Sequence, residues 1–255
     1  MTTPALHATV ERAYEVFKMR KAPGGPLNVC TSCCMPDELE REMRALPLRK
    51  ISTRHFYEYC NGAMGELVQP AEEIKYLLPR WLELLAAGEE THLLPELTLD
   101  RVGRCPAGSF SAGEESVLDA FMLAYFDHQL NGGGFWGWSG DPLSLLIMAD
   151  AGGRDVRPLL QHWLEHQNPV STAQFVRSTY WDFWPKCRLS SAFAEDRPVL
   201  QATFKAWILA PNTQAAFIEK LHHPEFIAQV DQVPAQGDMP FSLMVDAVLD
   251  NLWHN

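Results

Sequence analysis

Apolar residues recur at spacings of three and four in one segment after another, and this period constrains the fold more than any other feature. It is typical of an amphipathic helix with one buried face. Residues 5–21 show it first. Residues 111–126 show it again, where Ser111 and Glu114 form a capping-box pattern that starts a helix. We find no series of alternating β-branched runs separated by hairpin turns. The sequence therefore predicts an all-α fold.

Proline and glycine mark the ends of the predicted helices. Pro23 to Pro26 ends the first, and Pro36 and Pro70 suit the first position of a helix. Ser52 is a suitable N-cap, and Pro79 predicts a kink or a fresh start inside its segment. Beyond residue 88 we predict helices at 89–102 (loosely helical), 142–151, 155–167, 170–184, 190–210, 212–222 and 240–253.

These helices are short to medium in length, and most carry one broad apolar face. This favours an irregular multi-helix bundle or a short α-solenoid of stacked antiparallel helix pairs. No fixed repeat period is found, so a regular repeat family is not supported. We predict a single all-helical domain over residues 1–255, with a possible seam in the glycine-rich stretch 131–141.

The formal net charge is −11, and residues 61–150 carry −10 of it. A strongly acidic region disfavours nucleic-acid binding, because phosphates must be neutralised by positive charge. It suits a basic protein partner, although charged helix faces also simply keep proteins soluble. Tryptophans in a glycine-rich loop could add a partner-binding anchor or cap the core instead. The candidate partner-binding residues are Glu72, Glu73, Glu89, Glu90, Trp136 and Trp138.

No segment has the pattern of a targeting sequence or a membrane span. The first 17 residues include Glu11, Arg12 and Glu15, where a signal peptide needs an apolar stretch. The longest apolar run, around 143–149, is far below the ~20 residues that span a bilayer. We expect a cytoplasmic protein without membrane contact, in which the six cysteines are reduced.

Three thiols occur within five residues at Cys30-Thr31-Ser32-Cys33-Cys34. Cys30 and Cys33 have the CxxC spacing that lets two sulfurs bind one zinc ion. Cys34 could join them only at a sharp turn of the backbone. A redox pair is disfavoured because CxxC oxidoreductases place it in a βαβ setting, whereas burial as small apolar residues stays open. The predicted zinc ligands are Cys30, Cys33, Cys34 and Cys60; His55, Cys105 and Cys187 are further candidates.

The segment from His162 to His166 fits HxxEH, the inverted zinc-peptidase pattern. On a helix the two histidines would share one face, with Glu165 beside them. Such an enzyme needs a third ligand, and only generic carboxylates such as Asp182 or Glu195 are on offer. Short patterns also arise by chance, so solvated histidines are the competing interpretation. No phosphate-binding loop or GxSxG motif is present.

Several segments resemble a group of uncharacterised bacterial cytosolic proteins of similar length. They are CTSCCM at 30–35, PLR at 47–49, HFYEY at 55–59, YLLPRWLEL at 76–84, RCP at 104–106 and YWDFW at 180–184. The resemblance covers most of the chain and implies no activity, cofactor or site residue. An acidic helical protein is also similar, in general terms, to the immunity proteins that accompany secreted bacterial toxins.

These observations favour a non-enzymatic binding protein. We expect an immunity or antitoxin-type protein that neutralises a basic bacterial toxin through its acidic surface. The alternatives are a zinc-dependent hydrolase and a metal-stabilised helical scaffold of unknown role.

Overall fold

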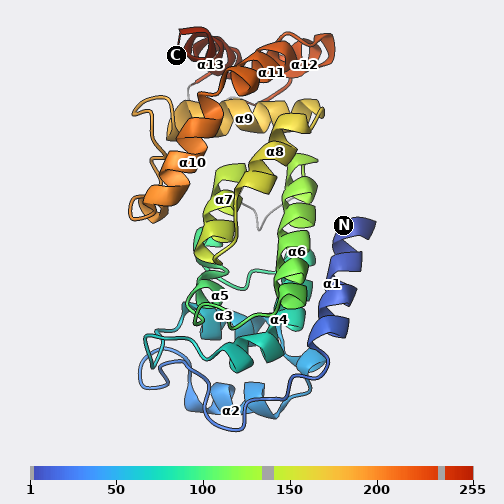
Figure 1. Cartoon of the computed structure of the whole chain (residues 1–255), viewed down its shortest axis with the longest axis vertical. Coiled ribbons are helices and arrows are strands. Elements are labelled where there is room, and N and C mark those ends of the chain that lie inside the picture. Colours follow the sequence, from blue (N-terminus) through green and yellow to red (C-terminus); the bar gives the residue numbers. More distant parts are fainter. Residues whose placement is uncertain (1–2, 134–140, 235–238, 255) are drawn as a thin grey trace. The chain divides into compact units, whose positions relative to one another are not determined.

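The protein is all-α, as predicted. A computed structural model describes residues 3–133, 141–234 and 239–254, and within these ranges it contains thirteen α-helices and three short 3-10 helices, with no strand (Figure 1). The chain divides into two compact units, which we describe separately. Unit 1 contains residues 3–128 and 148–155; unit 2 contains 129–133, 141–147 and the described residues from 156 onward.

Unit 1 is built from the N-terminal helices. Its elements are α1 (Pro4–Phe17), α2 (Asp37–Ala45), η1 (Leu48–Lys50), α3 (Thr53–Asn61), α4 (Ala71–Ala86), η2 (Pro95–Leu97), α5 (Asp100–Gly103), residues 112–128 of α6 (Ala112–Leu130) and residues 148–151 of α7 (Pro142–Ala151). Helix α1 packs along α4 and buries Leu6, Val10, Ala13 and Phe17. The predicted apolar stripe of the first helix is therefore confirmed.

Unit 2 contains the remaining elements: α8 (Arg157–Glu165), α9 (Pro169–Asp182), η3 (Ala192–Ala194), α10 (Pro198–Ile208), α11 (Pro211–Leu221), α12 (Pro224–Val230) and α13 (Phe241–His254). Helix α9 contacts α11, α12 and α13. The core of unit 2 is aromatic. Phe175 stacks on Phe217, and Trp163 stacks on Trp207 with ring centroids 5.8 Å apart.

The two helix starts predicted from caps are confirmed. Ser52 is the N-cap of α3 and forms a capping box with His55. Before α6, the Ser111 N–H donates to Glu114 and the Glu114 N–H donates to the Ser111 hydroxyl. Both caps satisfy backbone N–H groups that a helix start leaves without partners.

At Pro79, where the sequence predicted a kink or a fresh start, helix α4 continues, so no fresh start occurs. Other local predictions differ from the structure. The segment 89–102 forms only η2 and the beginning of α5, because Pro95 opens a short 3-10 turn in place of a continuous helix. Helix α12 was not predicted. The predicted seam falls where α6 and α7 each contribute to both units, although residues 134–140 lie outside the described chain.

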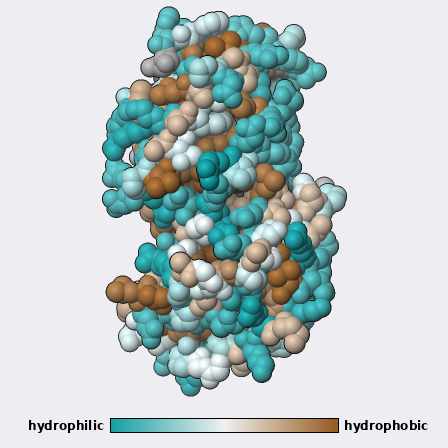
Figure 2. Space-filling model, viewed as in Figure 1, coloured by the Kyte–Doolittle hydropathy of each residue, from teal (hydrophilic) through white to brown (hydrophobic). Residues whose placement is uncertain are grey.

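Within the described chain, none of the helices has the length and apolar character needed to cross a membrane. On the face in Figure 2, apolar side chains form separate patches among hydrophilic ones. Apolar atoms form much of the surface of most folded proteins, so small separate patches require no special explanation.

Candidate metal centre

The three cysteines of the 30–34 segment converge. The Cys33 sulfur lies 3.5 Å from the Cys30 sulfur and 3.5 Å from the Cys34 sulfur. All three sulfurs lie within 4.8 Å of one another. The sharp turn that Cys34 requires is present, since the Met35 N–H donates to the Cys30 carbonyl at 3.1 Å. The three sulfurs are therefore close enough to bind one ion, and zinc binding itself stays a prediction.

A short segment after α3 holds this loop in place. The Cys30 N–H donates to the Ala63 carbonyl at 2.6 Å, and the Ala63 N–H donates to the Cys34 sulfur at 3.4 Å. Gly62 lies directly against the loop. A Cβ atom at this position would lie 2.9 Å from the Glu58 carbonyl oxygen and 3.3 Å from the Cys34 Cβ atom, so the close approach favours glycine.

Buried Arg101, from α5, binds residues next to the contact between the cysteine loop and the Gly62–Ala63 segment. Its side chain is 4% exposed. One terminal nitrogen donates to the Asn28 carbonyl (2.7 Å) and the Gln69 side chain (3.0 Å). The other donates to the carbonyls of Tyr59 (2.6 Å) and Gly62 (2.8 Å). The planar guanidinium thus joins the chain before Cys30 to the end of α3.

Glu73 completes this buried network from the first turn of α4. Its carboxylate accepts from the Asn28 N–H at 2.9 Å, the Tyr59 hydroxyl at 2.5 Å and the Gln69 amide at 2.7 Å. Asn28 is therefore held by both Glu73 and Arg101. Sequence inspection missed Arg101, because an isolated arginine in an acidic region carries no motif.

The hydrogen bonds within the cysteine loop favour the thiolate form of Cys30. The pKa of the Cys30 thiol is lowered, chiefly because the Cys33 thiol donates to it and then because the backbone N–H groups of Cys33 and Ser32 do so. The same interaction with Cys30 raises the pKa of Cys33 to about 11. Donors directed at a sulfur also favour a metal-bound thiolate, whose charge they stabilise.

The fourth predicted ligand, Cys60, does not join the cluster. It is buried, and burial raises the pKa of its thiol. Within the part of the chain that the structure describes, no fourth side-chain ligand lies with Cys30, Cys33 and Cys34. Cys60 is therefore a small core residue, as free cysteines often are. Its place at the last turn of α3 was not evident from spacing.

Two further candidates are occupied by local structure. The His55 Nδ1 contacts the backbone and hydroxyl of Ser52 at the start of α3. Cys105 donates its thiol to the Arg101 carbonyl, and burial raises its pKa to about 12. The third candidate, Cys187, belongs to unit 2, where its backbone has a positive φ of 48°.

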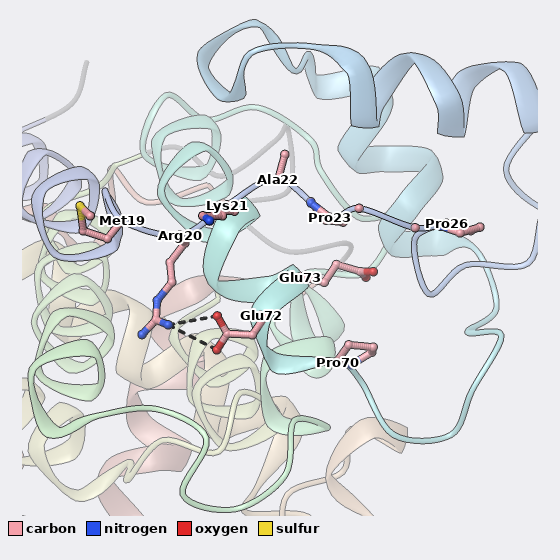
Figure 3. Close-up of a pocket in the computed structure, with 11 residues that line it drawn as sticks. Met19, Arg20, Lys21, Ala22, Pro23, Pro26, Pro70, Glu72 and Glu73 are labelled. Carbon is pink, nitrogen blue, oxygen red and sulfur yellow. Dashed lines mark hydrogen bonds and ion pairs between the residues drawn. The ribbon is translucent and has the colours of Figure 1, made fainter.

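The acidic residues predicted to bind a partner have different environments. Glu72 is exposed and pairs with Arg20 at 3.0 Å and with Lys75 at 2.9 Å. Figure 3 shows the Arg20–Glu72 pair beside a cavity of about 520 Å³ that residues 19–26 share with the start of α4. Glu73 is buried, so its prediction as a surface contact was wrong. Glu89 and Glu90 are exposed; Trp136 and Trp138 lie outside the described residues.

The two histidines of the HxxEH segment lie close together, although only His162 is inside a helix. Helix α8 ends at Glu165 and His166 is extended with ψ of 124°, yet a ligand nitrogen of each ring lies within 4.8 Å of the other. The Nδ1 of His166 lies 3.1 Å from the Ser171 hydroxyl, while Glu165 accepts a hydrogen bond from the Gln161 amide. The suggested carboxylate of Glu195 pairs with Arg188 at 3.4 Å.

His92 in unit 1 links acid pH to stability. It is 9% exposed, and burial lowers its pKa from 6.5 to about 4. The unfolded chain therefore takes up a proton first as the pH falls below 6.5. We expect this residue to lower the free energy of unfolding by about 2 kcal/mol between neutral pH and about pH 4.5.

Urea titrations at the two pH values test this expectation, and His92→Gln should lose this pH-dependent part of the stability. His254→Gln, at an exposed position, should keep it; equal acid sensitivity of wild type and His92→Gln would contradict the assignment.

Comparison of the chain with protein-family profiles, with curated proteins and with solved structures finds no match in any of the three. The geometry of the residues themselves is thus the basis for a functional proposal.

Proposed function

We propose that this protein binds a soft metal ion through the thiolates of Cys30, Cys33 and Cys34. The observation that carries the proposal is the convergence of three sulfurs within 4.8 Å on a loop whose backbone is held by hydrogen bonds. Thiolates select Zn²⁺ and Cu⁺ over the harder cations. Zinc would take a fourth ligand from water or another molecule, because it prefers four ligands in a tetrahedral arrangement.

Binding, rather than hydrolysis, is the role we propose. Cys33 is exposed, so an external ligand has access to the ion at the position that the protein leaves open. The zinc-peptidase alternative has less support, because Glu165 accepts a hydrogen bond from the Gln161 amide and the Nδ1 of His166 lies at the Ser171 hydroxyl. The basic protein partner stays a separate prediction. Among the described residues its support comes from the exposed Glu89 and Glu90, since Glu72 is ion-paired and Glu73 is buried.

The test is the metal stoichiometry of the purified, reduced protein. We expect wild type to bind about one Zn²⁺ or Cu⁺ per chain, in competition with a chromophoric chelator. Cys33→Ser should lose this binding. Cys187→Ser, which removes a thiol from unit 2, and Cys60→Ser, which removes the buried thiol, should both keep it. Absence of high-affinity binding, or equal binding by Cys33→Ser, would overturn the proposal.

A further inference from the structure

A small cavity of unit 1 lies beside the Gly62–Ala63 segment that holds the cysteine loop. Its volume is about 210 Å³. This is below the ~300–1,000 Å³ typical of sites for drug-sized ligands, so it suits a smaller molecule. Part of its lining is apolar, from Trp81 and Leu97, and part is polar. The polar part includes His92, Asp100, Arg101 and Arg104.

His92 offers this cavity a hydrogen-bond donor. The Nδ1 atom of His92 accepts the Leu94 N–H at 2.9 Å, which leaves the proton of the neutral ring on Nε2. Among the described residues, that Nε2–H donates to no hydrogen-bond acceptor. His92 is 9% exposed and lines the cavity, so we take a molecule bound there as the acceptor of this hydrogen bond.

The unengaged donors around the cavity favour an anion. The fixed charges roughly balance, because Asp100 pairs with Arg104 and the Glu73 carboxylate shares the buried network of Asn28, Tyr59 and Gln69 with Arg101. Both terminal nitrogens of Arg101 donate to oxygens of the buried network. Arg104 uses its Nε atom to bind Asp100, so its two terminal nitrogens can donate to a bound anion.

The same geometry argues against a cysteine–histidine catalytic pair here. The Cys60 thiol lines the cavity with His92, but a general base needs an unprotonated nitrogen facing the nucleophile. Nδ1 is occupied by the Leu94 N–H, and Nε2 carries the proton. Binding is therefore the role that the side chains support.

We propose that this cavity is a binding site for a small monocarboxylate with a short apolar body. The carboxylate accepts hydrogen bonds from His92 Nε2 and from the terminal nitrogens of Arg104, and the apolar body packs against Trp81 and Leu97. The residues proposed to bind the carboxylate are different from the three thiols of the proposed metal site.

Isothermal titration of the full chain with butyrate and benzoate, with butyramide and benzamide as neutral controls, tests this proposal. We expect saturable binding of one or both carboxylates with a Kd at or below about 1 mM, and no measurable binding of the amides. His92→Leu and Arg104→Met should each weaken binding by about tenfold or more. His92→Gln, which keeps a donor, should recover part of the affinity.

Arg188→Met is the matched control, because Arg188 also belongs to an exposed arginine–carboxylate pair but lies in unit 2. It should bind the carboxylates as wild type does. A second measurement on the wild type guards against variants that fail to fold: the Nε2 nitrogen resonance of His92 should shift on carboxylate addition. Failure of both carboxylates to bind, equal binding of the amides, or an unchanged His92 resonance at saturation would overturn the proposal.

Discussion

Replacing Gly103 by alanine is expected to lower the free energy of unfolding by about 3 kcal/mol. A Cβ atom on Gly103, at the end of α5, would lie 1.9 Å from the Ala151 carbonyl oxygen at the end of α7 and 3.2 Å from the Gly153 nitrogen. These are backbone atoms, so no side-chain rotation can relieve the clash. The two helix ends would have to move apart, which is the costly form of overpacking.

Gly113→Ala is the matched control for this substitution. Gly113 lies in the first turn of α6, and a Cβ atom there would meet no atom within 4 Å. Alanine favours the helix over glycine, so stability should be unchanged or should rise by about 0.5 kcal/mol. Urea unfolding followed by far-ultraviolet circular dichroism measures both variants. Equal stability of Gly103→Ala and wild type would mean that α5 and α7 are not in this close contact.

Replacing Arg101 by methionine is expected to cost at least about 3 kcal/mol. The substitution removes the Arg101 donor from four oxygens, on Asn28, Gln69, Tyr59 and Gly62, of which the Gln69 oxygen keeps a second donor in the Asn28 amide. Each buried acceptor that loses its partner costs roughly 1–3 kcal/mol, and relaxation recovers only part of the sum. Arg101→Lys should recover a fraction, because a single ammonium cannot reproduce the planar fork of a guanidinium.

The Arg101 variants also connect stability with the cysteine loop. Without the guanidinium, the residues before Cys30 lose an anchor, so Arg101→Met should weaken metal binding even under conditions where the chain remains folded. Arg188→Met serves as the control, because its exposed ion pair should contribute less than about 1 kcal/mol. Wild-type stability of Arg101→Met, or its wild-type metal affinity when folded, would contradict the role assigned to this residue.

Local patterns in the sequence predicted most helices, because helix period and capping depend on residues that are near one another in the chain. The Ser52 and Ser111 caps are of this kind. The convergence of Cys30, Cys33 and Cys34 was also accessible from local spacing. The sequence reading went wrong where a residue's role depends on distant partners. Glu73 reads as a surface charge beside Glu72, yet it is bound by the Asn28 N–H, 45 residues away.

The role of Arg101 also depends on distant partners, and nothing in the sequence singles this residue out. Its four acceptors lie 32 to 73 residues earlier in the chain, and three of them are backbone carbonyls, which carry no sequence signature. A lone arginine in an acidic region gives no indication that it is buried. The acceptors that surround the Arg101 guanidinium become visible only when the positions of α3, α5 and the residues before Cys30 are known.

The aromatic core of unit 2 supplies an optical probe of its own folding. Trp163 and Trp207 stack with an interplanar angle of 21°, whereas Trp81 is the one tryptophan of unit 1 among the described residues. Stacked indole rings couple their electronic transitions, so the near-ultraviolet spectrum should report mainly on unit 2. The far-ultraviolet signal reports on helices of both units. Comparing the two bands through one denaturation would therefore reveal whether the N-terminal and C-terminal halves melt as one cooperative block or in succession.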